Sequence, residues 1–376
     1  MGHLYYENKN FAGGAFEKKI IKSVYFGKEL LWPHIPLFIT VDTSISKTIT
    51  LENVNGLSID WGDGNFGTGG SATTHTFSDI GIYEIKIEGM SVIPDAFLTS
   101  QTSVIKLFSK ILFSSIGDNA FYYCSAITSF IADFSKITQI HDSNTGVFRN
   151  AFASGSHIEL NFSSDAFIKL GVQAFYVSKV WKVHFSPNAT FSVGGGAFST
   201  CNELVEVTLG RITSLGDNAF YNCSAITSFT ADFSQITQIP DSSSGVFRNA
   251  FASGSHIELN FSSDAFTKLG VQAFYVSKVW KVHFSPNATF SVGGGAFSAC
   301  NELVEVTLGI VTIIDTNAFY NCIKLQTIRI SNPNPPPINT VIPTNSLQKI
   351  YVPAASLSAY QNATGWIAYA SYMEGF

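Results

Sequence analysis

Five cysteines are the first residues whose chemistry can be judged from their spacing. They occur three residues after a Phe of a repeated unit: Cys124, Cys201, Cys223, Cys300 and Cys322. Other units have a small residue at that place: Ser100, Gly155, Ser178, Gly254 and Ser277. Cysteines on adjacent units would project in parallel, which is poor disulfide geometry, and no pair has the close spacing of a zinc site. We predict buried thiols that hold no metal or cofactor.

Histidines and glycines offer little more for catalysis. His157 and His184, with their copies His256 and His283, lie in or beside strand-like runs. A catalytic histidine needs a nucleophile and an orienting acid nearby, and the unit does not supply them in an obvious pattern. The triplet 194–196 lacks the Lys-Ser/Thr ending of a phosphate-binding loop, so we expect it to form a coil corner. The sequence therefore predicts a protein that is not an enzyme.

A long internal repeat organises the chain. Gly117 to Leu215 returns almost letter for letter as Gly216 to Ile314, a period of about 99 residues. Within it an Ala-Phe pair recurs at steps of about 22 to 24 residues, with one step of about 31 in each copy, which is the range of leucine-rich repeats. The aromatic members are Phe97, Phe121, Phe152, Phe175, Phe198, Phe220, Phe251, Phe274, Phe297 and Phe319.

Short alternating runs follow these pairs, as in Val180–Phe185 and Leu204–Leu209. Period-two alternation indicates half-buried strands. Such strands can bury their apolar faces by stacking into a parallel solenoid, here of about eleven coils. The longer step inserts the turn formers 142–146 and 241–245, for which we expect a loop at one edge.

The outward positions of these strands form the predicted ligand-binding face. Its residues are Lys182, His184, Glu206 and Thr208 in one copy, and Lys281, His283, Glu305 and Thr307 in the other. Ser129, Glu159, Asn161, Ser228, Glu258 and Asn260 accompany them. The two patches would lie about four coils apart at roughly 4.8 Å per coil, so a repetitive ligand would gain avidity. A solvated face without a ligand is the alternative interpretation.

The units 116–127 and 215–223 resemble the BspA-like family of bacterial leucine-rich-repeat surface proteins. The resemblance runs from about residue 91 to 376, and 347–353 is similar to the family's closing unit, with a cap from about residue 340. The ladder Asn of the commonest leucine-rich repeats is missing. The resemblance implies a non-enzymatic binding or adhesion protein, at the cell surface or secreted, with a protein or glycan ligand that can be host-derived.

Residues 36–90 have a different sequence pattern from the repeat. Alternating strands are broken by Asp60-Trp61-Gly62-Asp63-Gly64, and the segment resembles a PKD-type β-sandwich. Asp60 and Asp63 provide too few oxygens for calcium, so we expect them to shape a turn. The predicted fold is mainly β with short helical turns: a leucine-rich-repeat solenoid preceded by a small β-sandwich domain.

Residues 1–35 resemble short joining segments of virion tail proteins, which leaves a phage or prophage tail component as the alternative function. The N-terminus has no signal-peptide pattern, although a mature form with its signal peptide removed would look the same. No apolar run is long enough for a membrane span. The net charge of -5 does not indicate a basic surface that could neutralise phosphates, so no nucleic acid partner is expected. The oligomeric state stays open.

Overall fold

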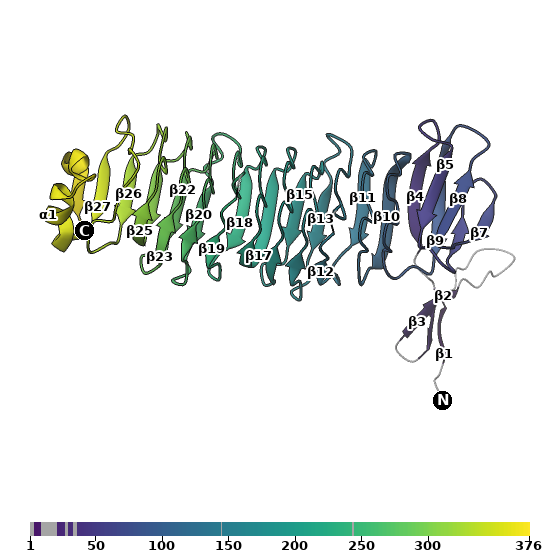
Figure 1. The fold of residues 1–376 in the computed structure, drawn as a ribbon. Coiled ribbons are helices and arrows are strands. Elements are labelled where there is room, and N and C mark those ends of the chain that lie inside the picture. The colour runs from purple at the N-terminus through teal and green to yellow at the C-terminus, as the bar shows by residue number, and fades with distance from the viewer. Residues whose placement is uncertain (1–3, 9–20, 27–28, 33–35, 144, 243) are drawn as a thin grey trace.

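The protein is a parallel β-solenoid of about 12 turns with very few helices. The computed structural model describes residues 4–8, 21–26, 29–32, 36–143, 145–242 and 244–376 (Figure 1). The mainly β solenoid predicted from the sequence is confirmed, and the number of turns is close to the eleven expected. Among the described residues, no helix is both long and apolar enough to cross a membrane.

One side of the solenoid carries the strands that we call the front strands. They form three groups, each paired in parallel in chain order. The first group is β10 (Val104–Leu112) and β11 (Ser129–Asp133). The second is β13 (Glu159–Phe162), β15 (Lys182–Phe185), β17 (Glu206–Leu215) and β18 (Ser228–Asp232). The third is β20 (Glu258–Phe261), β22 (Lys281–Phe284), β24 (Glu305–Leu308), β26 (Thr327–Ile330), β27 (Lys349–Val352) and β28 (Met373–Gly375).

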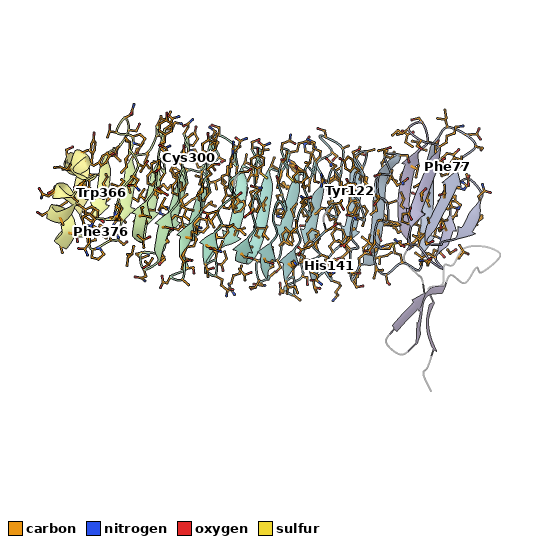
Figure 2. The ribbon with its side chains drawn as sticks, in the orientation of Figure 1. Phe77, Tyr122, His141, Cys300, Trp366 and Phe376 are labelled. Carbon is orange, nitrogen blue, oxygen red and sulfur yellow. The ribbon has the colours of Figure 1, made fainter. Side chains whose placement is uncertain are left out.

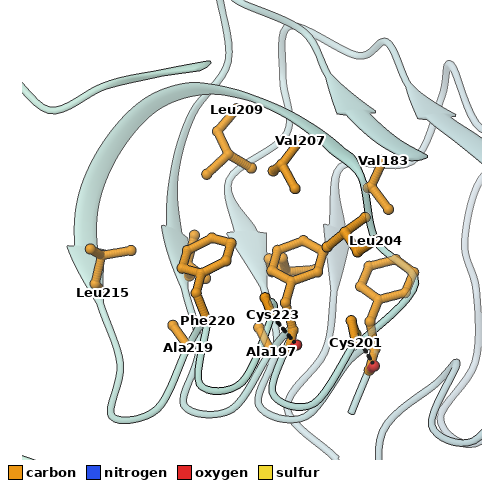
Figure 3. Packing of buried hydrophobic residues seen from close by; sticks show 14 of the residues in the cluster. Val183, Ala197, Cys201, Leu204, Val207, Leu209, Leu215, Ala219, Phe220 and Cys223 are labelled. Atoms are coloured by element: carbon orange, nitrogen blue, oxygen red, sulfur yellow. Dashed lines mark hydrogen bonds between the residues drawn. The ribbon is translucent and has the colours of Figure 1, made fainter. Parts of the chain in front are cut away.

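A second set of shorter strands closes the coils. Its members are β12 (Gln139–Ile140), β14 (Lys169–Leu170), β16 (Thr190–Val193), β19 (Gln238–Ile239), β21 (Lys268–Leu269), β23 (Thr289–Val292) and β25 (Ile310–Ile314). The long strand β17 bends from one set to the other, since it pairs with both β15 and β16. Apolar residues of both sets point into one continuous core (Figure 3).

A ladder of stacked phenyl rings runs along this core. Its members are Phe121, Phe148, Phe175, Phe198, Phe220, Phe247, Phe274, Phe297 and Phe319, and neighbouring ring centroids are 5.1 to 5.4 Å apart. The Ala-Phe pattern counted Phe152 and Phe251 as the members for their coils, but Phe148 and Phe247 occupy the ladder there. Val147 and Val246 take the place of the ladder's usual Ala, so the Ala-Phe pattern selected the next pair along the chain.

Phe152 instead packs beneath the first group of front strands. Its ring lies 5.6 Å from that of Phe130 in β11 and 5.8 Å from that of Phe148. β11 and β13 do not pair, and the corresponding strands β18 and β20 do not pair either, with Phe251 at the same place beside Phe229. The extra residues of the longer coils therefore divide the front strands into their three groups.

The cysteines lie three residues after ladder positions and are fully buried. Each thiol donates a hydrogen bond to a backbone carbonyl of the preceding coil, as from Cys201 Sγ to Phe175 O at 2.8 Å. Burial raises the pKa of the Cys124, Cys223 and Cys322 thiols to about 12. Three residues after the ladder members Phe148 and Phe247 come Ala151 and Ala250, instead of the glycines expected from the Ala-Phe pattern. The requirement for a small residue at this position is therefore confirmed.

The coil edges agree with the turn residues read from the sequence. Gly194 forms a corner where an added Cβ would lie 2.6 Å from the Gly171 carbonyl carbon, so the backbones are in direct contact. In the inserted loops, Asp142 is bound to Lys169 of the next coil (Nζ to Oδ2, 2.5 Å), and Asp241 pairs with Lys268 in the same way. Asn144 and Ser243 lie outside the described residues.

Two sheets precede the solenoid. β4 (Leu37–Asp42), β9 (Ile82–Glu88), β6 (Ser58–Asp60) and β7 (Phe66–Thr68) form one, and β5 (Thr48–Glu52) and β8 (Ala72–Thr76) form the other. β4 also pairs antiparallel with β10, so the first of these sheets continues into the front strands. This continuity was not anticipated from the sequence.

The turn after β6 has the role expected of its carboxylates. Asp60 Oδ1 accepts a hydrogen bond from the Gly62 N–H (2.9 Å), and Asp63 Oδ2 lies 2.7 Å from His75 Nε2. Gly62 has a φ of +78°, and an added Cβ would lie 2.4 Å from the Glu84 carbonyl oxygen. Both conditions require glycine there.

Residues 1–35 were predicted to form a joining segment. Their described parts are β1 (Leu4–Asn8), β2 (Ile21–Phe26) and β3 (Glu29–Trp32), which form a three-stranded antiparallel sheet. The rest of that segment lies outside the described residues.

At the other end, η1 (Ala354–Ser356), α1 (Leu357–Asn362) and η2 (Ile367–Tyr372) close the solenoid (Figure 2). The buried Trp366 donates from Nε1 to the Pro336 carbonyl (2.7 Å), and the Ile342 N–H donates to the Tyr369 hydroxyl (2.9 Å). These contacts cover the apolar end of the last coil, which is the role of a solenoid cap.

Candidate binding face

Two rows of outward side chains cross the front strands. Parallel register places Glu159, Lys182 and Glu206 side by side in one row. The second row contains Asn161, His184 and Thr208. The other copy repeats both rows with Glu258, Lys281 and Glu305, and with Asn260, His283 and Thr307. All eight residues selected from the sequence therefore lie together on adjacent strands, four in each copy.

An ion pair joins two of the three members of the first row in each copy. Lys182 Nζ lies 2.6 Å from Glu206 Oε2, and Lys281 Nζ lies 3.1 Å from Glu305 Oε2. The hydrogen bond from Lys182 lowers the pKa of the Glu206 carboxyl below its usual value. Partly exposed pairs of this kind contribute about 0.2–1 kcal/mol to stability. Their main effect here is to compensate the charges of the face and to orient its long side chains.

The histidines of the second row are held between neighbours on both sides. His184 Nδ1 lies 3.2 Å from Thr208 Oγ1, and its Nε2 lies 3.8 Å from Glu159 Oε1. The corresponding distances for His283 are 3.0 Å to Thr307 and 3.6 Å to Glu258. Both rings therefore have the same restrained position in the two copies.

In each copy a tryptophan adds an aromatic surface that was not predicted from the sequence. Lys182 Nζ lies 4.5 Å above the ring of Trp181, and Lys281 Nζ lies 4.4 Å above that of Trp280. The His157 ring meets Trp181 edge-on, with centroids 5.1 Å apart. Both tryptophans are half-buried. Their position directly before a lysine of the face was the sequence signal that could have identified them.

A second line of aromatic and basic residues follows the ladder. Arg149 lies between Tyr122 and Tyr176, with its guanidinium carbon 6.0 and 4.7 Å from the two ring centroids. Arg248 lies in the same way between Tyr221 and Tyr275. Each residue comes directly after a ladder Phe. This line could not be read from the Ala-Phe pattern, because that pattern does not include Phe148 and Phe247.

The front rows also extend beyond the second copy. Thr327 and Lys349 continue the first row, and Arg329 and Tyr351 continue the second. The Arg329 guanidinium packs over the rings of Tyr351 and Phe376 at 4.9 and 4.2 Å. The alternation within 327–330 could have indicated this extension.

The geometry of the face suits recognition of polar groups. Its two lysines are already paired with Glu206 and Glu305, so a ligand would meet ordered donors and acceptors at these positions. In the part of the chain that the structure describes, no three His, Cys, Asp or Glu side chains form a group that could hold a metal ion.

Comparison with known proteins identifies the repeat. The family model described as a BspA type leucine rich repeat region matches residues 70–150, 114–247 and 232–350, which together run without a gap from 70 to 350. A search of curated proteins found no match.

Two solved structures are similar over much of their length. One is a leucine-rich repeat protein from Bacteroides ovatus ATCC 8483, with 16% identity and a TM-score of 0.39, covering 80% of this chain and 90% of that chain. Another is a leucine rich cell surface protein from Faecalibacterium prausnitzii A2-165, with 16% identity and a TM-score of 0.32, covering 74% of this chain and 88% of that chain.

Proposed function

The chain belongs to the BspA-type leucine-rich repeat family, and from this premise we propose that it is a non-enzymatic binding or adhesion protein of a bacterial cell surface. Its ligand is a protein or a glycan, host-derived ones included. The solenoid supplies an extended, ordered surface, and binding requires no reaction at any of its residues.

One observation carries this proposal: the same face occurs twice in one rod. The contacts of Lys182 and His184 recur at Lys281 and His283, down to the histidine–threonine and lysine–tryptophan pairs. Two equal sites on a rigid scaffold favour a ligand that repeats its own recognition element, because the second contact is made at high effective concentration.

We further propose that residues 36–90 are a PKD-like module that orients the solenoid, which occupies residues 91–376. The pairing of β4 with β10 supports an orienting role, because the two parts share a sheet and cannot move independently without breaking it. The tail-component alternative had rested on residues 1–35, and neither their described strands nor the comparisons favour it.

The test measures capture by the two faces together. The fourfold variant Lys182→Gln, His184→Ala, Lys281→Gln and His283→Ala is compared with wild type for binding to immobilised extracellular matrix and to mucin. A double variant, Lys169→Gln with Lys268→Gln, serves as the matched control because it breaks equivalent ion pairs on the other set of strands. We expect the fourfold variant to lose at least about tenfold in affinity and the control to bind normally. Equal binding by both variants would refute the assignment of these residues to a binding face.

Cell-surface location is tested separately. Intact source cells are treated with protease and immunoblotted beside a cytoplasmic marker. Selective loss of this protein is expected, and full protection would contradict the proposed location.

A further inference from the structure

A shallow groove lies where the N-terminal sheet joins the front strands. It has a volume of about 430 Å³ and is formed by β4, β9, β10 and β11. The strand register sorts its side chains into two adjacent rows. Glu84, Thr40 and Lys106 form a polar row. Phe38, Phe108 and Ile131 form an apolar row beside it.

The apolar row is exposed at a place where solenoid packing does not require it. Phe108 is 39% and Ile131 53% exposed. The two copies of the long repeat differ at only twelve positions, and one of these has Thr230 in place of Ile131. Phe108 is the strand partner of Ile131 in the first group of front strands. In the second group, the strand partner of Thr230 is Thr208. A front strand of this chain therefore folds equally well with threonines in these places.

Within the described residues, the side chains of the polar row have no polar partner, unlike the charged side chains of the binding face. Among the described residues, Glu84, Thr40 and Lys106 make no side-chain hydrogen bond or ion pair. By contrast, Lys182 and Lys281 are both paired with glutamates. Glu84 and Lys106 lie on opposite sides of Thr40, so their charges balance over the groove as a whole.

We infer that this groove binds a neutral sugar ring of a glycan. A pyranose has an apolar C–H face that can stack on Phe38 and Phe108, whose ring centroids are 6.4 Å apart. Its rim of hydroxyls can donate to Glu84 and accept from Lys106. The volume is within the range of about 300–1,000 Å³ that is typical of small-ligand sites. An anionic or a cationic ligand would find one of the two charged side chains repulsive.

A second groove, of about 470 Å³, lies on the other side of Ile131 and is also lined by Asp133 and Asn161. In the other copy, the residue equivalent to Asp133 is bound to Arg211 (Oδ2 to Nε, 3.1 Å). Leu112 stands opposite Asp133 in place of that arginine, and among the described residues the Asp133 carboxylate forms no ion pair, with Lys110 lining the same groove. An oligosaccharide can therefore continue past Ile131 into a second polar pocket.

The inference rests on the proposed function only in treating the chain as a binding protein, because Glu84, Phe108 and Ile131 of the groove are not among the eight residues assigned to the repeated face. It is tested by native affinity electrophoresis in gels that contain soluble starch, α-mannan, mixed-linkage β-glucan or galactan, with heparin as the anionic control. The variants are Phe108→Thr and Ile131→Thr, which introduce the residues that the chain itself has at Thr208 and Thr230, and Glu84→Gln. Ile168→Thr is the matched control, because Ile168 is exposed outside the groove and its counterpart in the other copy of the repeat is Thr267.

We expect at least one neutral polysaccharide to retard the wild type, and Phe108→Thr to weaken the interaction at least about tenfold. Ile168→Thr should behave as wild type. The inference is overturned if no neutral polysaccharide retards the protein, if heparin alone does, or if Phe108→Thr is retarded normally. It is also overturned if sedimentation velocity shows a dimer that Phe108→Thr dissociates, because the groove would then hold a second copy of the chain. The two proposals can fail separately, because the groove is tested by Phe108→Thr and the repeated face by the fourfold variant.

Discussion

The phenyl rings of Phe148 and Phe175 lie parallel, with centroids 5.1 Å apart and an interplanar angle of 3°. The two residues are 27 positions apart, a longer step than the usual unit of this chain. The rings nevertheless maintain the same stacking distance as those of shorter coils. The ladder thus sets the spacing of the solenoid, and extra residues are accommodated around it.

Removing one phenyl ring of the ladder should therefore destabilise the fold. Phe148→Ala is expected to lower the free energy of unfolding by about 3–5 kcal/mol, because it leaves a cavity between two stacked rings. Urea denaturation followed by circular dichroism measures the change. Phe66→Ala is the control, since Phe66 is 75% exposed, and it should alter stability by less than about 0.5 kcal/mol. A similar small effect of Phe148→Ala would contradict the ladder.

The cysteines should be unreactive in the folded protein. Burial raises the pKa of the Cys124 thiol to about 12, and Cys201 and Cys300 are raised in the same direction by burial. The reactive thiolate is therefore scarce at pH 8 as well as inaccessible. We expect a thiol reagent to label none of the five in native protein and all five in guanidinium. Labelling of the native protein within minutes would show that the thiols are accessible.

The Lys182–Glu206 pair should make a small, pH-dependent contribution to stability. Because the folded-state pKa of Glu206 is lowered, chiefly by the hydrogen bond from Lys182, this contribution is complete above the unfolded-state pKa of about 4.5 and is lost as the pH falls through the folded value. Glu206→Gln should cost under about 1 kcal/mol at pH 7. The difference from wild type should shrink as the pH falls below 4.5 and should vanish once the folded-state carboxyl is protonated. A cost that persists there would indicate a role other than the ion pair.

The cap should protect the last coil from association. Trp366→Ala removes a fully buried ring and is expected to destabilise the chain by about 3–5 kcal/mol and to cause aggregation. Trp366→Phe keeps most of the ring but leaves the Pro336 carbonyl without its donor, so a cost of about 1–3 kcal/mol is expected. Light scattering and thermal unfolding measure both effects. A monomeric Trp366→Ala protein of normal stability would show that the cap is dispensable.

Much of the candidate face could be predicted because alternation decides which way a strand residue points. Lys182, His184 and Val183 alternate in sequence, and they alternate between surface and core in the structure. The partners of these residues could not be predicted with the same ease. Trp181 beneath Lys182 was missed because a large apolar residue beside a strand is usually assigned to the core.

The sequence by itself determined the architecture: a duplicated array of short strands, with small residues where coils meet and aromatic residues inside. These properties are local or periodic, and they can be read without knowing which coil lies beside which. Only the tertiary structure decided that Phe148, rather than Phe152, joins the ladder, that β4 pairs with β10, and that Phe108 and Ile131 form an exposed row at their junction. The physical reason is that register between strands depends on how side chains from distant parts of the chain fill a shared core, and residues with the same local pattern compete for each place in it.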